Sequence, residues 1–154
     1  MSNFLAGIDI GSKKSAIAYL NLEDNSYLIL VPVFSEIPDT TQRILFIAAQ
    51  IKKSLKQHKP THVFIEDCLY IQNFWTSKIL SNLQGMIELI CTDLKIPFTI
   101  VPTTRWRKIC GTGKIKKEQI KKFAQEKWPD KEFITQDLCD AACLSLWGLQ
   151  QMNM

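Results

Sequence analysis

The sequence predicts an α/β fold, in which helices flank a five-stranded mixed sheet. Three apolar segments with short connections come first, which favours an antiparallel meander of three strands. Two further apolar segments each follow a segment with apolar residues at helical spacing, so strands four and five can pair parallel to strand one. The chain of 154 residues fits a single domain, and no repeat or linker divides residues 1–154.

The first half of the chain supplies four strands and one helix. The predicted strands are residues 4–10, 15–22, 26–33 and 61–66. Pro32 places the third strand at an edge, because proline cannot donate a hydrogen bond to a neighbouring strand. A helix begins with Asp39 or Thr40 as its cap and ends before Pro60.

The second half is mainly helical. The predicted elements are a helix at 73–94, a strand at 97–101, a short helix after Pro102, a basic helix at 114–127 and a last helix from 137 to about 150, capped by Thr135. Helix 73–94 is apolar on more than one face, so we expect it to be buried on two sides. The sheet covers one side, and a partner subunit or a second helix of the same chain covers the other.

Composition excludes several classes of protein. Apolar content is 46% and charged content is 22%, and no apolar run approaches the roughly 20 residues that span a bilayer. The N-terminus does not resemble a signal peptide, so we expect a cytoplasmic protein without a membrane partner. The five cysteines lack Cys-x-x-Cys spacing and are expected to be reduced and buried, and two histidines are too few for a histidine-rich metal site.

Positive charge is concentrated in one segment. The net charge is +4, but residues 105–122 alone carry a balance of +7, which leaves −3 for the remainder. Such a segment is typical of a protein that binds a polyanion, and equally of a solvated helix face.

Four acidic residues occupy positions that a common site would require. Asp137 and Asp140 are three apart on a helix and point the same way, and two like charges on a packed face repel unless a cation lies between them. Asp9 and Glu66 end strands one and four, which places them side by side if those strands are parallel. Alternatively, Asp9 caps a turn, Glu66 is a surface residue, and the two helical aspartates favour a helix N-terminus.

The order of strands, helices and acids resembles the ribonuclease H-like nuclease fold, and more closely the RuvC family of Holliday junction resolvases. The matching motifs are Gly-Ile-Asp-Ile-Gly at 7–11 (with Ile10 in place of the family's proline), Phe-Ile-Glu at 64–66, Gly-Thr-Gly at 111–113 followed by Lys-Glu-Gln-Ile at 117–120, and Asp-Leu-Cys-Asp-Ala at 137–141. The resemblance spans residues 4 to about 148. The small size looks most like a phage-encoded member, which would act in the host cytoplasm.

The resemblance implies a metal-dependent endonuclease that resolves Holliday junctions and other branched DNA by paired cuts with 5′-phosphates. Two Mg²⁺ ions, replaceable by Mn²⁺, would be held by Asp9, Glu66, Asp137 and Asp140. It also implies a homodimer, for which helix 73–94 is the best interface. The expected DNA contacts are Tyr70, Arg105, Arg107, Lys108, Lys114, Lys116 and Lys117. The family carries an aromatic residue where this chain has Leu69, next to Tyr70.

Other interpretations remain. A ribonuclease H-like nuclease could act on forks, flaps or RNA–DNA hybrids without junction preference, and a non-catalytic DNA-binding module is a further alternative. A phosphotransferase with an Asp-x-Gly phosphate loop would need two such domains, and this length holds one. Trp75 is expected to pack in an apolar environment, and Trp106, Trp128 and Trp147 are expected in the core.

Overall fold

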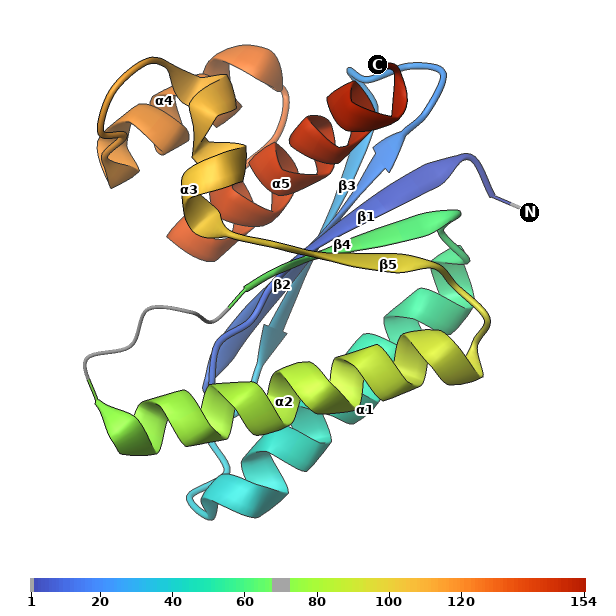
Figure 1. Cartoon of the computed structure of the whole chain (residues 1–154), viewed down its shortest axis with the longest axis vertical. Coiled ribbons are helices and arrows are strands. Elements are labelled where there is room, and N and C mark those ends of the chain that lie inside the picture. The colour runs from blue at the N-terminus through green and yellow to red at the C-terminus, as the bar shows by residue number, and fades with distance from the viewer. Residues whose placement is uncertain (1, 68–72) are drawn as a thin grey trace.

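Five strands form one sheet in the order β3-β2-β1-β4-β5, in a computed structural model that describes residues 2–67 and 73–154 (Figure 1). The strands are β1 (Phe4–Asp9), β2 (Lys14–Asn21), β3 (Leu28–Phe34), β4 (His62–Glu66) and β5 (Phe98–Val101). The first three pair antiparallel, and β4 and β5 run parallel to β1. The predicted fold class is therefore confirmed, and β3, which contains Pro32, lies at an edge as expected.

Helices cover both faces of the sheet. The helices are α1 (Thr40–His58), α2 (Phe74–Asp93), α3 (Thr103–Trp106), the 3₁₀ helix η1 (Arg107–Cys110), α4 (Lys117–Lys127) and α5 (Gln136–Met152). Figure 1 shows α1 and α2 on one face and α3, α4 and α5 on the other. None of the helices in the described ranges is both long and apolar enough to cross a bilayer.

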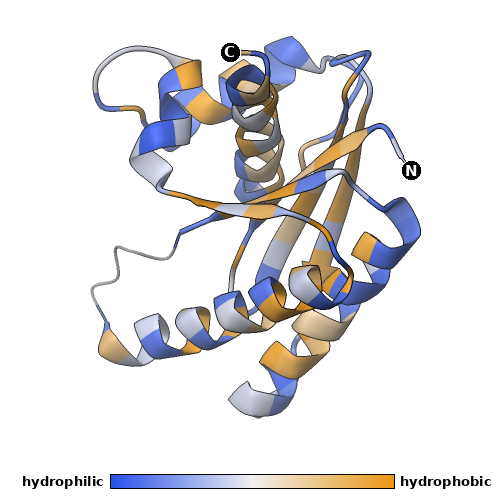
Figure 2. Cartoon of the chain, turned by 45° about the vertical axis from the view of Figure 1, so that its right-hand side comes forward, coloured by the Kyte–Doolittle hydropathy of each residue, from blue (hydrophilic) through white to orange (hydrophobic). Residues whose placement is uncertain are grey.

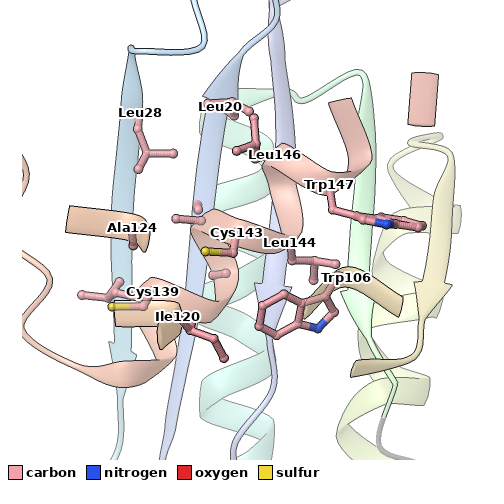
Figure 3. Close-up of a cluster of buried hydrophobic side chains, with 14 of the residues drawn as sticks. Leu20, Leu28, Trp106, Ile120, Ala124, Cys139, Cys143, Leu144, Leu146 and Trp147 are labelled. Atoms are coloured by element: carbon pink, nitrogen blue, oxygen red, sulfur yellow. The ribbon is translucent and has the colours of Figure 1, made fainter. Parts of the chain in front are cut away.

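Each face of the sheet has its own hydrophobic core. On β1, Leu5 packs in the core beneath α5, whereas Ala6 and Ile8, which point to the opposite face, pack in the core beneath α1 and α2. This alternation follows from the two-residue period of a strand. Figure 2 shows the strands largely in the hydrophobic colour, and Figure 3 shows the α5-side core, where residues of α5 meet Trp106 and α4.

Helix α5 lies unusually close to the sheet. A Cβ atom on Gly7 of β1 would lie 2.8 Å from the backbone nitrogen of Ser145 and would also collide with the carbonyl oxygen of Ala141. A Cβ on Gly148 would lie 2.7 Å from Cζ of Phe64 on β4. Small residues at these points therefore allow the backbone of α5 to rest directly on β1 and β4.

Polar side chains fix the starts of three helices. Asp39 accepts a hydrogen bond from the backbone N–H of Gln42 at 2.8 Å, and Thr135 accepts from Leu138 at 3.3 Å. Asn73 does the same for Trp75 at 2.8 Å. Such caps satisfy backbone donors that lack a partner inside the helix. The predicted caps of α1 and α5 are confirmed, with Asp39 rather than Thr40 capping α1.

Two local expectations were wrong. Helix α4 begins at Lys117 instead of 114, because Gly113 has a positive φ of 77° and the chain then turns Ile115 into the core, where it is 6% exposed. Trp75 does not pack in an apolar environment: its side chain is 61% exposed in the first turn of α2, with the ammonium of Lys78 over its ring at 5.5 Å from the centroid. The described cysteines are all free thiols, and three of the four are buried.

Candidate metal centre

Asp9 and Glu66 meet because of the parity of their two strands. Leu5 and Phe64 both belong to the core beneath α5. Because side chains alternate along a strand, Asp9, four residues after Leu5, and Glu66, two residues after Phe64, face the same side. The parallel register of β1 and β4 brings both to the same end of the sheet. Asp9 is only 7% exposed.

The first turns of α5 bring the other two acids to this pair. Ala141 rests against Gly7 of β1, two residues before Asp9. Asp137 lies one turn before Ala141, and its side chain lies near enough to Asp9 to raise the pKa of that carboxyl. The charge of Asp140 also acts on Asp9. The structure therefore brings together all four predicted acids, at the place where α5 begins over the ends of β1 and β4.

The crowding of these acids changes the ionisation of Asp9. Burial raises the pKa of Asp9 well above its usual value, and the charges of Glu66, Asp140 and Asp137 raise it further. Both effects penalise a second negative charge in a confined, water-poor place. A group of carboxyls in this condition gains stability from any cation that can lie among them.

Three side chains from outside the acidic group moderate its charge. Burial raises the pKa of Glu66, opposed first by the hydrogen bond that Nε1 of Trp106 donates to Oε2 of Glu66 at 2.7 Å. Burial also raises the pKa of Asp140, to about 7, opposed by the bond that Nε2 of Gln136 donates to its Oδ1 at 3.0 Å. The positive charge of Arg107 lowers both pKa values.

Sequence reasoning missed Trp106 and Gln136 as parts of this site. Trp106 was expected in the core and does lie there, fully buried, but its indole N–H also reaches a carboxylate. Gln136 lies one turn before Asp140 on the same helix, and that spacing was the available signal, because residues four apart share a helix face.

The donor set fits a hard divalent cation. Carboxylate oxygens are the ligands that Mg²⁺ and Mn²⁺ prefer, and the group contains no imidazole. Within residues 2–67 and 73–154, no three Asp, Glu, His or Cys side chains have the arrangement of a formed metal-binding group. In this arrangement, Asp137 and Glu66 both act to raise the pKa of Asp9. Metal ligation by these residues stays a prediction.

The predicted DNA contacts are divided between two surfaces. Lys114, Lys116 and Lys117 are exposed around the start of α4, and the carbonyl of Lys117 accepts a bond from Gln136 at 3.4 Å, which places it beside the acids. Arg105 and Lys108 are also exposed. They line a hollow against the second half of α5, with Trp147, Gln150 and Gln151.

Arg107 differs from the other predicted DNA contacts. Its guanidinium stacks over the ring of Trp106, with Cζ 5.8 Å from the ring centroid, and its charge acts on Glu66 and Asp140. It is partly buried, and among the described residues its Nε is a buried polar atom without a hydrogen-bond partner. Tyr70 and Leu69 lie outside the described residues.

Sequence comparison identifies a family for most of the chain. Residues 5–146 match the family model of crossover junction endodeoxyribonuclease RuvC. A curated relative of that name from Brachyspira hyodysenteriae is 26% identical over 145 residues, covering 91% of this chain and 89% of the relative. Another, from Fusobacterium nucleatum, is 30% identical over 124 residues, covering 78% of this chain and 65% of the relative.

Solved structures share the fold. The RuvC of Thermus thermophilus in complex with a Holliday junction substrate superposes with a TM-score of 0.81 at 17% identity, covering 94% of this chain and 91% of that one. The yeast mitochondrial Holliday junction resolvase gives a TM-score of 0.66 at 12% identity, covering 99% of this chain and 79% of that one. The sheet and its helical layers are thus those of junction resolvases.

Proposed function

The chain belongs to the family of crossover junction endodeoxyribonuclease RuvC, and from this premise we propose that it is a metal-dependent endonuclease that resolves four-way DNA junctions. The single observation that carries the proposal is the meeting of Asp9, Glu66, Asp137 and Asp140 at one end of the sheet in a chain of that family. Its place of action would be the cytoplasm.

The four acids would hold two Mg²⁺ ions, with Mn²⁺ as a substitute. Ions held there would supply an activated water and charge stabilisation at the leaving 3′ oxygen of the phosphodiester, and the expected product carries a 5′-phosphate. The chain contributes rigid oxygen donors: two extend from adjacent strands, and two from the start of a helix that rests on those strands. Gln136 orients Asp140 by its hydrogen bond.

The DNA backbone would be held by basic residues around this centre. Lys117 lies next to the acids through the bond between its carbonyl and Gln136, and Lys114 and Lys116 precede it in the same exposed segment. Lysine side chains bind phosphates without reading sequence, so they would position the junction over the centre. Arg105 and Lys108 would contact a second part of the substrate along α5.

A homodimer would match the two-fold symmetry of a four-way junction, because two centres can then cut opposed strands. Helix α2 supports this assembly. Its inner face buries Leu83, Ile87 and Cys91, whereas Leu89 on its outer face is 61% exposed. A Cβ on Gly85 would meet no atom within 4 Å, so this outer face is open to a second helix.

Replacing Asp9 tests the proposed function. We expect Asp9→Asn to abolish nicking of a labelled four-way junction in Mg²⁺, because the most enclosed donor of the centre is lost. Binding of the junction in Ca²⁺, measured by gel shift, should stay within about threefold, since phosphate contacts come from other residues. Asp130→Asn, at an exposed position, is the control and should cut normally.

The same assay separates junction resolution from a broader nuclease activity. Junction, fork, flap and RNA–DNA hybrid substrates are compared in competition, each with Mg²⁺, Mn²⁺ and Ca²⁺. Equal cutting of all four substrates would show that the protein is a general ribonuclease H-like nuclease without junction specificity. Near-normal cutting by Asp9→Asn would contradict the proposed centre itself.

A further inference from the structure

A short helix folds back over Glu66. Val101, at the end of β5, pairs with Glu66 in the parallel register, and Pro102 then begins the turn into α3. Thr103 and Trp106 of α3 are three residues apart, and residues at that spacing lie on one side of a helix. Trp106 donates to Glu66 through Nε1 to Oε2 at 2.7 Å, and the side chain of Thr103 also lowers the pKa of Glu66.

Trp106 is a rigid donor. Its side chain is fully buried, and Figure 3 shows its indole beside Leu144 of α5. An indole has one N–H donor and no acceptor, so its bond to Glu66 can run in one direction only. The guanidinium of Arg107 stacks against the same ring. The ring therefore cannot swing away from Glu66 without opening the core.

A glutamate side chain rotates about several bonds and does not hold its carboxylate in place by itself. The indole fixes Oε2 of Glu66, and a carboxylate held through one oxygen keeps a set orientation toward a bound cation. Hydrogen-bonded partners of metal ligands act in this way in other metal sites, where their loss costs about 10- to 100-fold in metal affinity or activity.

We propose that Trp106 is a positioning residue that fixes the Glu66 carboxylate, through its indole N–H, in the orientation required to bind a divalent cation. The inference rests on the proposed function of the acidic centre. It assigns α3, which sequence reasoning treated as a carrier of DNA-binding residues, a second role in building the centre.

The chain offers a matched control for this role. Trp128 is also fully buried, and its Nε1 donates to the carbonyl of Asn25 at 2.9 Å, within the loop between β2 and β3. Trp106→Phe and Trp128→Phe therefore remove the same atoms from a core and break one indole hydrogen bond each. Only the first change releases a carboxylate of the proposed centre.

Binding of Mg²⁺ to the full chain without DNA, measured by isothermal titration calorimetry, is the primary readout. We expect the Kd for Mg²⁺ to rise about 10- to 100-fold in Trp106→Phe and less than about threefold in Trp128→Phe. On the junction, kcat should fall by a similar factor with KM nearly unchanged, because DNA contacts remain. Equal Kd values in the two variants would overturn the proposal.

A double-mutant cycle tests whether the effect passes through Glu66. In a Glu66→Gln background, Trp106→Phe should cause no further loss of Mg²⁺ affinity, since the carboxylate that the indole orients is already absent. A further loss as large as in the wild-type background would assign Trp106 a general packing role and overturn the proposal.

Resonances of the indole groups keep the proposal testable if Trp106→Phe does not fold. In ¹H–¹⁵N spectra of the full chain, Mg²⁺ should move the indole resonance of Trp106 but not that of Trp128, and an unmoved Trp106 resonance would overturn the proposal. A chain that binds Mg²⁺ but cuts no junction would refute the proposed function alone, and the Kd comparison would still decide the role of Trp106.

Discussion

The Asp140 carboxyl is largely buried near Glu66 and Asp137, and its pKa rises to about 7, chiefly because burial penalises the ionised form. The bond from Gln136 and the charge of Arg107 offset only part of this effect. At neutral pH the group is therefore poised between its two states. A divalent cation would favour the ionised state, because it replaces the bound proton by a stronger positive charge.

We expect the metal-free protein to lose stability as pH rises from about 4 to 7. Asp140 has a pKa near 3.8 when unfolded and about 7 when folded, so the folded state binds more protons in this window and the free energy of unfolding falls with pH. Asp140 alone would contribute a loss on the order of 4 kcal/mol. Asp9 and Glu66, whose pKa values are also raised, act in the same direction.

Thermal unfolding in EDTA, followed by circular dichroism from pH 4 to 8, measures this dependence. Asp140→Asn should flatten the curve and unfold at a higher temperature than the wild type at pH 8, whereas the exposed Asp130→Asn should not. Restoring Mg²⁺ at pH 8 should raise the Tm of the wild type. A Tm that stays constant or rises from pH 5 to 8 without metal would contradict the burial argument.

At the scale of elements, the position of α5 depends on two glycines, Gly7 and Gly148, which let its backbone approach the sheet closely. Its backbone rests on Gly7 of β1, two residues before Asp9, so any lift of the helix carries Asp137 and Asp140 away from the strands. The contact of Gly148 with Phe64 holds the later part of the same helix. Packing of the core and geometry of the centre thus depend on the same contacts.

Gly7→Ala should therefore impair both stability and cleavage. The added methyl group would lie 2.8 Å from the backbone nitrogen of Ser145, and backbone atoms cannot turn aside as a flexible side chain can. Overpacking of this kind costs about 1–3 kcal/mol, and we expect a more than tenfold loss of nicking. Denaturant titration and the junction assay measure the two effects.

Gly85→Ala is the matched change, because a Cβ there meets nothing within 4 Å. Since alanine favours a helix over glycine, this variant should gain about 0.5–1 kcal/mol. Full activity together with unchanged stability in Gly7→Ala would show that α5 does not rest on β1 as described.

Strand alternation and helix periodicity were enough to predict the four acids of the centre, but not the residues that surround them. Asp9 and Glu66 end apolar strands joined by a helical crossover, and Asp137 and Asp140 share a helix face, so their meeting follows from local periodicity. Trp106 was classified by its apolar character, which says nothing about where its N–H points. That direction depends on how α3 folds back over β4, which is a tertiary feature.

The same limit explains the errors in the helices. An apolar residue at helical spacing predicts burial, but Trp75 lies in the first turn of α2, beyond the cover that α1 and the sheet provide. The three residues before Lys117 are compatible with a helix by composition. They follow Gly113, however, whose positive φ ends any helical path, and Ile115 gains more by entering the core.

At the scale of the whole molecule, the two faces of the sheet carry different functional elements. One face carries α5, the acids and the basic segments, and the other carries α1 and α2 (Figure 1). The 20 residues of α2 extend over about 30 Å, and its outer side carries Leu89, Gly85 and the aromatic ring of Trp75. An open helix of this length, with Leu89 and Trp75 exposed on it, suits a two-fold partner that would place two centres on one junction.

Leu89→Lys tests this assembly. A charge on the exposed outer face should not disturb the monomer, but it would be buried in a dimer built on α2, so we expect the dimer Kd from sedimentation equilibrium to rise at least about tenfold. Ile134→Lys is the control, because Ile134 is similarly exposed, at 60%, in the segment before α5. Paired cuts on a junction should then become independent single nicks in Leu89→Lys only, since two centres would no longer bind the same junction as a dimer.

Two outcomes would contradict this assembly. A wild-type chain that resolves junctions fully while sedimenting as a monomer would exclude the dimer. An unchanged dimer Kd in Leu89→Lys would show that the interface does not lie on α2.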